Sequence, residues 1–188
     1  MKKAITTTAI LLGLSSMVGA STAGPQQSHQ KPSLDETTKA IRKTAYEMMK
    51  AFLTQDVNSF KRHSAKRTLE LVSLAYEAAR QDPRYQQELQ TARITNADEF
   101  LGYFMLGLAT QYLQAAPLSL EAAARRVAND SKVSFLSATE ASIIVGSSEF
   151  AKARLVARAW KIDLTDSLKK AVLKEVNNPE LRARIERL

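Results

Sequence analysis

The amino-acid sequence predicts an α+β protein: helices in the N-terminal two-thirds pack on a small antiparallel sheet of three to four strands, and a C-terminal helix follows. Two observations carry this prediction. Apolar residues recur at helical spacing from residue 34 to about residue 128, and the period changes to two between residues 132 and 164. The length of 188 residues suits one domain, which we place at 33–188, after a signal peptide at 1–23 and a flexible polar lead-in at 24–32.

The first segment has the layout of a secretory signal peptide. Lys2 and Lys3 precede an uncharged stretch at 4–18, and small residues fill 19–23. The alternative, an N-terminal membrane anchor, is disfavoured because the apolar stretch is short and is interrupted by serine and threonine. We therefore expect cleavage before Ser21 or Gly24, a periplasmic or secreted mature chain, and no transmembrane span after cleavage.

Composition excludes several kinds of site. The chain has no cysteine and two histidines, so it forms no disulfide, cysteine-ligated metal site or three-histidine metal site. It also lacks the glycine-rich phosphate-binding motifs, the H-E-x-x-H motif and the G-x-S-x-G motif, so we predict no metal and no cofactor. The net charge is +8, and it falls to +6 when Lys2 and Lys3 are removed with the signal. An exported basic protein meets little nucleic acid, so an anionic envelope, or solubility alone, explains this charge better.

The helices are predicted from apolar spacing and from capping residues. Ser33 and Glu36 form a capping box before a helix at about 34–54, and Asp56 caps a short helix at 57–63. Asn96 and Glu99 form a second box before a segment at 100–113 that is apolar nearly all round. We interpret this segment as the central core helix, with buried side chains at Leu101, Phe104, Met105 and Leu108. Other helices are expected at 68–80, 83–92, 120–128 (capped by Ser119), 167–176 (capped by Thr165 or Asp166) and 180–187.

The strands are predicted at 132–136 and 142–145 and within 149–164. In the last region alanines alternate with Lys152, Arg154 and Arg158, which gives one apolar face and one basic face. Trp160 falls on the basic face if the strand is continuous, whereas a turn near Arg158 returns it to the apolar face. Periodicity alone leaves one long strand and a hairpin both open. The size of the only tryptophan favours burial under the helices, against Met49 or Phe52, and therefore favours the turn.

Two short segments resemble the nuclear-transport-factor-two-like superfamily, which has a cone-shaped α+β roll. The segment at 55–60 (QDVNSF) is similar to the step that joins the first two helices of that family, and the segment at 160–164 (WKIDL) is similar to its last strand. The chain departs from the family in lacking a glycine in the turn before Trp160, in its long helical insert at about 65–128 and in its final helix. The resemblance implies a fold but no particular activity, because the functions of the family are diverse.

We expect two binding features. The first is an apolar ligand pocket between helices and sheet, lined by Phe104, Met105, Leu108, Tyr112 and Trp160. The second is an anion-binding basic surface, for which charged faces that only keep the protein soluble are the alternative; its residues are Lys61, Arg62, Lys66, Arg67, Lys152, Arg154 and Arg158.

No catalytic residue is predicted. His63 lies in a basic run and is expected to be solvated, and Asp163 could line a pocket but is expected to be exposed near a strand edge. The leading hypothesis is therefore an exported, non-enzymatic binding or accessory protein. The alternatives are a small hydrolase or isomerase of the cone family and an envelope-associated interaction module with a basic face. A small apolar ligand or an envelope component is the expected partner, and the oligomeric state is left open.

Overall fold

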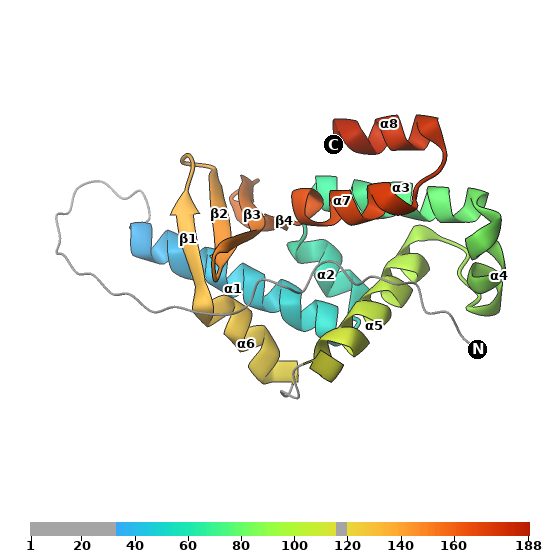
Figure 1. Ribbon diagram of the computed structural model, residues 1–188. Helices are drawn as coiled ribbons and strands as arrows, with labels where there is room; N and C mark the ends of the chain where they lie inside the picture. The colour runs from blue at the N-terminus through green and yellow to red at the C-terminus, as the bar shows by residue number, and fades with distance from the viewer. Residues whose placement is uncertain (1–32, 116–119) are drawn as a thin grey trace.

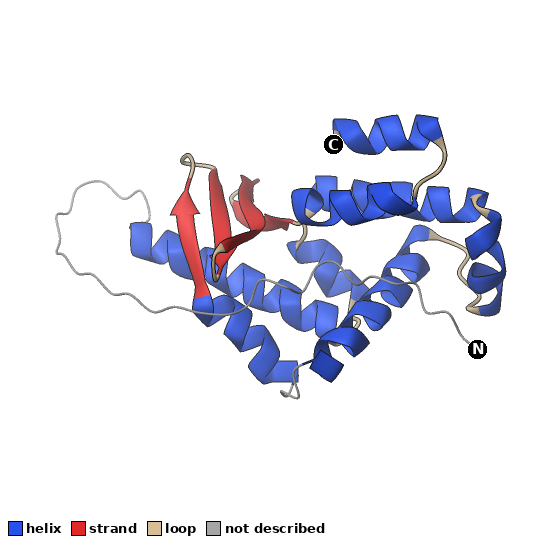
Figure 2. Cartoon of the chain, in the orientation of Figure 1, coloured by secondary structure: helices blue, strands red, loops and turns tan. Residues whose placement is uncertain are grey.

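The computed structural model describes residues 33–115 and 120–188, and it has the predicted α+β architecture (Figures 1 and 2). The signal peptide and lead-in expected at 1–32 and the cap expected at Ser119 lie outside these residues. The helices are α1 (Leu34–Leu53), α2 (Val57–His63), α3 (Lys66–Gln81), α4 (Pro83–Thr91), α5 (Ala97–Ala115), α6 (Leu120–Asp130), α7 (Thr165–Glu175) and α8 (Pro179–Arg187). The strands are β1 (Ser131–Phe135), β2 (Glu140–Val145), β3 (Ser148–Val156) and β4 (Ala159–Asp163).

The helix starts follow the predicted capping chemistry with two exceptions. Ser33 and Glu36 form both hydrogen bonds of a capping box, and the Asp56 carboxylate accepts from the backbone N–H of Ser59. At α5 Asn96 caps as expected, but the Glu99 carboxylate accepts from the N–H and hydroxyl of Thr95 instead of closing a box. At α7 the expected caps are wrong, because the helix already begins at Thr165, after Leu164, whose side chain cannot cap.

The sheet is an antiparallel meander in the order β1-β2-β3-β4. The region at 149–164 is a hairpin, and its turn consists of Ala157 (φ 48°) and Arg158 (φ 68°). Positive φ at both central residues is the geometry of a type I′ turn, whose twist matches that of the flanking strands. The turn therefore places Trp160 opposite Leu155 and on the same face of the sheet.

A bulge in β3 gives the sheet an additional core aromatic. Ile143 pairs with Ala151 and Ile144 pairs with Glu149, so Phe150 has no partner on β2. An extra residue of this kind bends the strand and redirects its side chain. Phe150 is half-buried and packs against core residues from α1 and α6.

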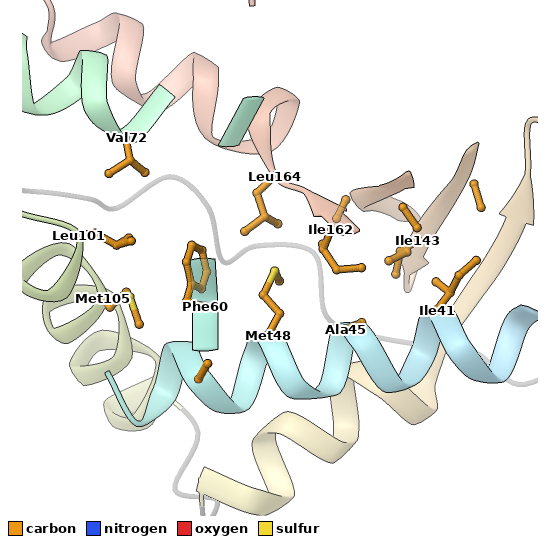
Figure 3. Packing of buried hydrophobic residues seen from close by; sticks show 14 residues of the cluster. Ile41, Ala45, Met48, Phe60, Val72, Leu101, Met105, Ile143, Ile162 and Leu164 are labelled. Carbon is orange, nitrogen blue, oxygen red and sulfur yellow. The ribbon is translucent and has the colours of Figure 1, made fainter. Parts of the chain in front are cut away.

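The inner face of the sheet, defined as the face that carries Ala141, Ile143, Ala153 and Ile162, packs on α1. Each of these four side chains has no exposed surface, and Figure 3 shows Ile162 above Ala45 and Leu164 above Met48 of α1. Phe60 of α2 and Leu101 and Met105 of α5 belong to the same cluster. Leu101 and Met105, which the sequence predicts to be buried, are therefore part of the same core as α1 and the inner face of the sheet.

Helix α3 and the C-terminal helices form a second cluster beside the sheet (Figure 1). The buried residues of this cluster come from α3, from α8 and from the connection between α7 and α8: Leu71, Leu74, Ala78, Val176, Leu181 and Ile185. Within residues 33–115 and 120–188, none of the helices combines the length and the apolar character that a bilayer span requires.

Candidate functional site

The inner face of the sheet is buried at one end and open at the other. Toward the β2–β3 turn, Ile143 and Ala151 are at most 2% exposed. Toward the β3–β4 turn, Trp160 is half-buried and Leu155 is 37% exposed, and on the edge strand β1 Phe135 is half-buried. The helices therefore cover the inner face from the β2–β3 turn through its middle and leave its last apolar row accessible. We call Phe135, Leu155 and Trp160 the open end.

This placement divides the predicted ligand-pocket residues. Trp160 lies at the open end, where it is partly buried and packs against the core cluster of α1 and the sheet. Its predicted burial is therefore confirmed only in part. Its expected ring contact with Met49 or Phe52 stays a prediction. Met105 is fully buried in the core as predicted, but the predicted burial of Phe104 is wrong: it is half-buried, because one face of α5 is accessible and exposes 44% of Leu106. The side chains of Leu108 and Tyr112 lie outside the described residues.

The outer face of the sheet is charged, and its charges are paired. Lys152 Nζ lies 2.8 Å from an oxygen of Asp166 at the start of α7. Arg154 lies 2.9 Å from Asp163 and 3.0 Å from Glu140. Lys152 and Arg154 thus occupy the basic face that the alternation predicted, but they neutralise carboxylates of the same chain.

Asp163 is the centre of this outer-face network. Its side chain is 2% exposed, so the expectation of an exposed strand carboxylate is wrong. The carboxylate accepts hydrogen bonds from Arg67 Nη1 (3.2 Å), Arg154 Nε (2.9 Å), the Thr68 hydroxyl (3.3 Å) and the backbone N–H of Thr165 (3.0 Å). Four donors from α3, β3 and α7 therefore fix one buried charge.

The pKa of Asp163 reflects this set of donors. Burial raises the pKa, but the hydrogen bonds from Thr165 and the charges of Arg67 and Arg154 outweigh burial and hold it below its ordinary value. A carboxylate that stays ionised, is almost fully buried and has four donors is suited to join elements, and it offers neither a proton nor a free lone pair to a substrate.

The other residues of the predicted anion-binding set are dispersed. Lys61 forms an ion pair with Asp98 on α5 at 2.7 Å. Arg62, Lys66 and Arg158 are exposed, and the backbone carbonyl of Arg62 accepts from Lys161 Nζ. Of the seven residues, Lys61, Arg67, Lys152 and Arg154 already face carboxylates of the chain. Anion binding by the full set stays a prediction.

His63 lies at the end of α2 and is half-buried, not solvated as expected. Burial lowers the pKa of the imidazole below its ordinary value, and the charges of Lys161 and Arg62 act in the same direction. Within the described residues the ring makes no hydrogen bond to a carboxylate that would orient it as a base. The described ranges also hold no group of three or more side chains arranged to ligate a metal.

Two surface hollows lie away from the sheet. One, of about 440 Å³, lies between α3 and the segment from α4 to α5, where its lining includes Tyr76, Arg80 and Ile94. The other, of about 490 Å³, lies along α7 and reaches Arg182 of α8, and four of the six residues that line it are cationic. The sequence analysis placed anion binding at the basic residues of 61–67 and 152–158 and did not predict this groove. The four-residue spacing of Lys170 and Lys174 in a predicted helix was the signal that could have indicated it.

Comparison with known proteins adds no function: no protein-family model, curated protein or solved structure matches this chain.

Proposed function

We propose that the protein is an exported, non-enzymatic binding protein that takes the apolar part of a small ligand at the open end of its sheet. The observation that carries this proposal is the loss of burial along the inner face, from 0% exposure at Ile143 to 37% at Leu155. An apolar surface that the covering helices leave accessible is a place where the apolar part of a small ligand can bind.

The energetics favour an occupant at this position. Trp160 and Leu155 stand opposite each other, so one apolar group can cover both. Covering apolar surface gains about 25 cal/mol per Å², so shielding about 150 Å² there contributes about 4 kcal/mol before the costs of association. Leu136 and Val156, the residues that follow Phe135 and Leu155, are also exposed, at 57% and 50%, but strand alternation directs them away from the inner face, so they are not part of the open end.

The titratable residues support binding over catalysis. The Asp163 carboxylate is saturated by donors of the chain, and Lys152 and Arg154 are used in ion pairs. The four donors that hold the Asp163 carboxylate do not include His63, so the two residues do not form an acid–base pair. The open end itself offers only apolar side chains, which bind without activating a substrate.

The family resemblance is part of the proposal. The residues at 55–60 join α1 to α2, and the segment at 160–164 forms β4 and the residue after it, as a cone-shaped roll requires. The long α1 across one face of an antiparallel sheet agrees with that fold. The helices α3 to α6 and the terminal α7 and α8 are then additions to the cone.

The proposal is tested with a neutral apolar probe, N-phenyl-1-naphthylamine, which has no charge to be attracted by the basic surface. We expect probe fluorescence to rise on binding to the mature chain, and Leu155→Asp to weaken the binding. Leu34→Asp is the matched control, because Leu34 is 67% exposed at the start of α1 and gains the same charge. Equal binding by both variants, with both folded by circular dichroism, would overturn the proposal.

A further inference from the structure

The groove along α7 and α8 is lined mostly by cationic side chains. It measures about 490 Å³ and is lined by Asp166, Lys169, Lys170, Leu173, Lys174 and Arg182. Four cations thus face one carboxylate. This groove is separate from the open end, because its residues come from the two helices that follow the sheet.

The single carboxylate of the groove is already neutralised from outside it. Asp166 lies 2.8 Å from Lys152 Nζ on β3 and 3.8 Å from Arg67 on α3. These partners lower the pKa of Asp166, so it stays charged and remains paired with them. Its negative charge therefore offsets cations of the sheet and of α3, and leaves the groove's own lysines uncompensated.

Two of the four cations of the groove already bind other groups of the described chain, and two do not. Arg182 lies 3.3 Å from Glu186, and its Nη1 donates to the Leu173 carbonyl, while Lys169 Nζ donates to the Glu186 carbonyl. Lys170 and Lys174 are exposed, and their ammonium groups form no hydrogen bond or ion pair with any described residue. They are four residues apart, so their stems rise from the same face of α7 about 6 Å apart along the helix.

We propose that this groove binds an oxyanion of the phosphate class, with Lys170 and Lys174 as its charged contacts. Two ammonium groups one helical turn apart can approach a single phosphate or diphosphate, and each has three N–H donors in a rotatable geometry. A neighbouring Lys169 retains donors beyond its one bond to the Glu186 carbonyl and adds to the positive potential. A compact, multiply charged anion is the ligand that such a site attracts most strongly.

The lining favours a compact anion over an acidic peptide. Leu173 is its only apolar residue, so the groove offers no pocket for the hydrophobic anchors that give most protein–peptide contacts their affinity. Two kinds of ligand carry such a phosphate group: a lipid headgroup at a membrane surface and a soluble phosphate compound. The test includes one probe for each kind.

Two assays on the mature chain at low salt test the proposal. The first is pyrophosphate binding measured by isothermal titration calorimetry. The second is co-sedimentation with phosphatidylglycerol vesicles, with vesicles of phosphatidylcholine alone as the control. The double variant Lys170→Gln/Lys174→Gln should weaken binding of at least one probe by about tenfold or more. The matched control is Lys39→Gln/Lys43→Gln, an exposed pair with the same spacing on α1, which should bind within about twofold of the wild type.

Binding of pyrophosphate that depends on the α7 pair supports a soluble phosphate ligand, and binding of anionic vesicles alone supports a headgroup. An equal loss in both double variants would show a general effect of net charge and would overturn the site. Absence of binding to both probes would overturn it as well. Circular dichroism melts of the variants exclude misfolding, because all four lysines are on the surface.

Discussion

Leu155 and Trp160 are paired across the β3–β4 hairpin, and the turn between them contains two non-glycine residues with positive φ. This relationship decides the face on which the only tryptophan lies. Without the turn at Ala157 and Arg158, alternation from Leu155 would direct Trp160 to the charged outer face. The hairpin therefore brings an aromatic and an aliphatic side chain together at the end of the sheet that α1 does not cover.

The first prediction concerns this turn. Ala157 and Arg158 hold φ values that L-residues adopt at a cost, whereas Asn-Gly favours both positions of a type I′ turn. We expect Ala157→Asn/Arg158→Gly to raise the free energy of unfolding by about 1 kcal/mol, measured by urea denaturation. Ala157→Val/Arg158→Val should lower it, because β-branched residues avoid this region. A stabilised valine variant would contradict the turn geometry.

The second prediction concerns the buried carboxylate. Asp163→Asn removes the charge that holds Arg67 and Arg154, and the loss of one partner from a buried ion pair costs about 3 kcal/mol or more. Because both arginines are about one-third exposed, we expect a loss of about 2–3 kcal/mol in the free energy of unfolding. Asp166→Asn is the control: its carboxylate is 46% exposed, and its loss should cost less than about 1 kcal/mol. Equal effects would show that Asp163 does not anchor the sheet to α3.

The third prediction is the pH dependence of the same residue. The pKa of Asp163 is lowered in the folded state, so its contribution is complete above the unfolded pKa and is lost as pH falls through the folded pKa. The difference in stability between wild type and Asp163→Asn should therefore be constant from neutral pH to about pH 5 and shrink below about pH 4. A difference that grows on acidification would contradict the assigned direction of the shift.

The fourth prediction concerns the core. Met105 is fully buried where α5 packs against the other helices of the core, and Met105→Ala should lower the free energy of unfolding by about 2–5 kcal/mol. Leu136→Ala removes a side chain of similar size that is 57% exposed, and it should cost less than about 1 kcal/mol. Similar losses for the two variants would place α5 outside the core. The expected cost of Leu108→Ala, about 2–5 kcal/mol, stays a prediction from the sequence.

The fifth prediction concerns export. Small residues precede Ser21 and Gly24, so the mature chain should begin at one of these residues. Sequencing of the N-terminus of the protein recovered outside the cytoplasm checks this. Recovery of the chain with Met1 intact from the soluble cytoplasmic fraction would contradict export.

Most elements of the fold follow from local sequence signals. Ser33, Asp56 and Asn96 cap helices where the sequence places them, and the change of period after Asp130 locates the sheet. These features could be predicted because each depends on residues close together in the chain. The hairpin could not be decided in this way, because Ala157-Arg158 carries none of the residues typical of a type I′ turn.

The candidate sites depend on contacts that no local pattern reveals. Asp163 and Arg67 are 96 residues apart in sequence, so the neutralisation of the basic face appears only when α3 packs against β4. The bulge at Phe150 likewise depends on the register between two strands. The sequence predicts Trp160 as a pocket residue, which stays a prediction, whereas the exposure of its neighbours Leu155 and Phe135 depends on which part of the sheet the helices cover.

The central claim is that an apolar ligand covers the open end, and Trp160 reports on it directly because the chain has one tryptophan. The measurement is Trp160 emission and its quenching by iodide, with and without saturating N-phenyl-1-naphthylamine. We predict partial quenching of the free protein, since the ring is half-buried, and energy transfer to the probe together with reduced iodide access on binding. Probe binding that leaves both the emission and the iodide quenching of Trp160 unchanged would contradict the claim.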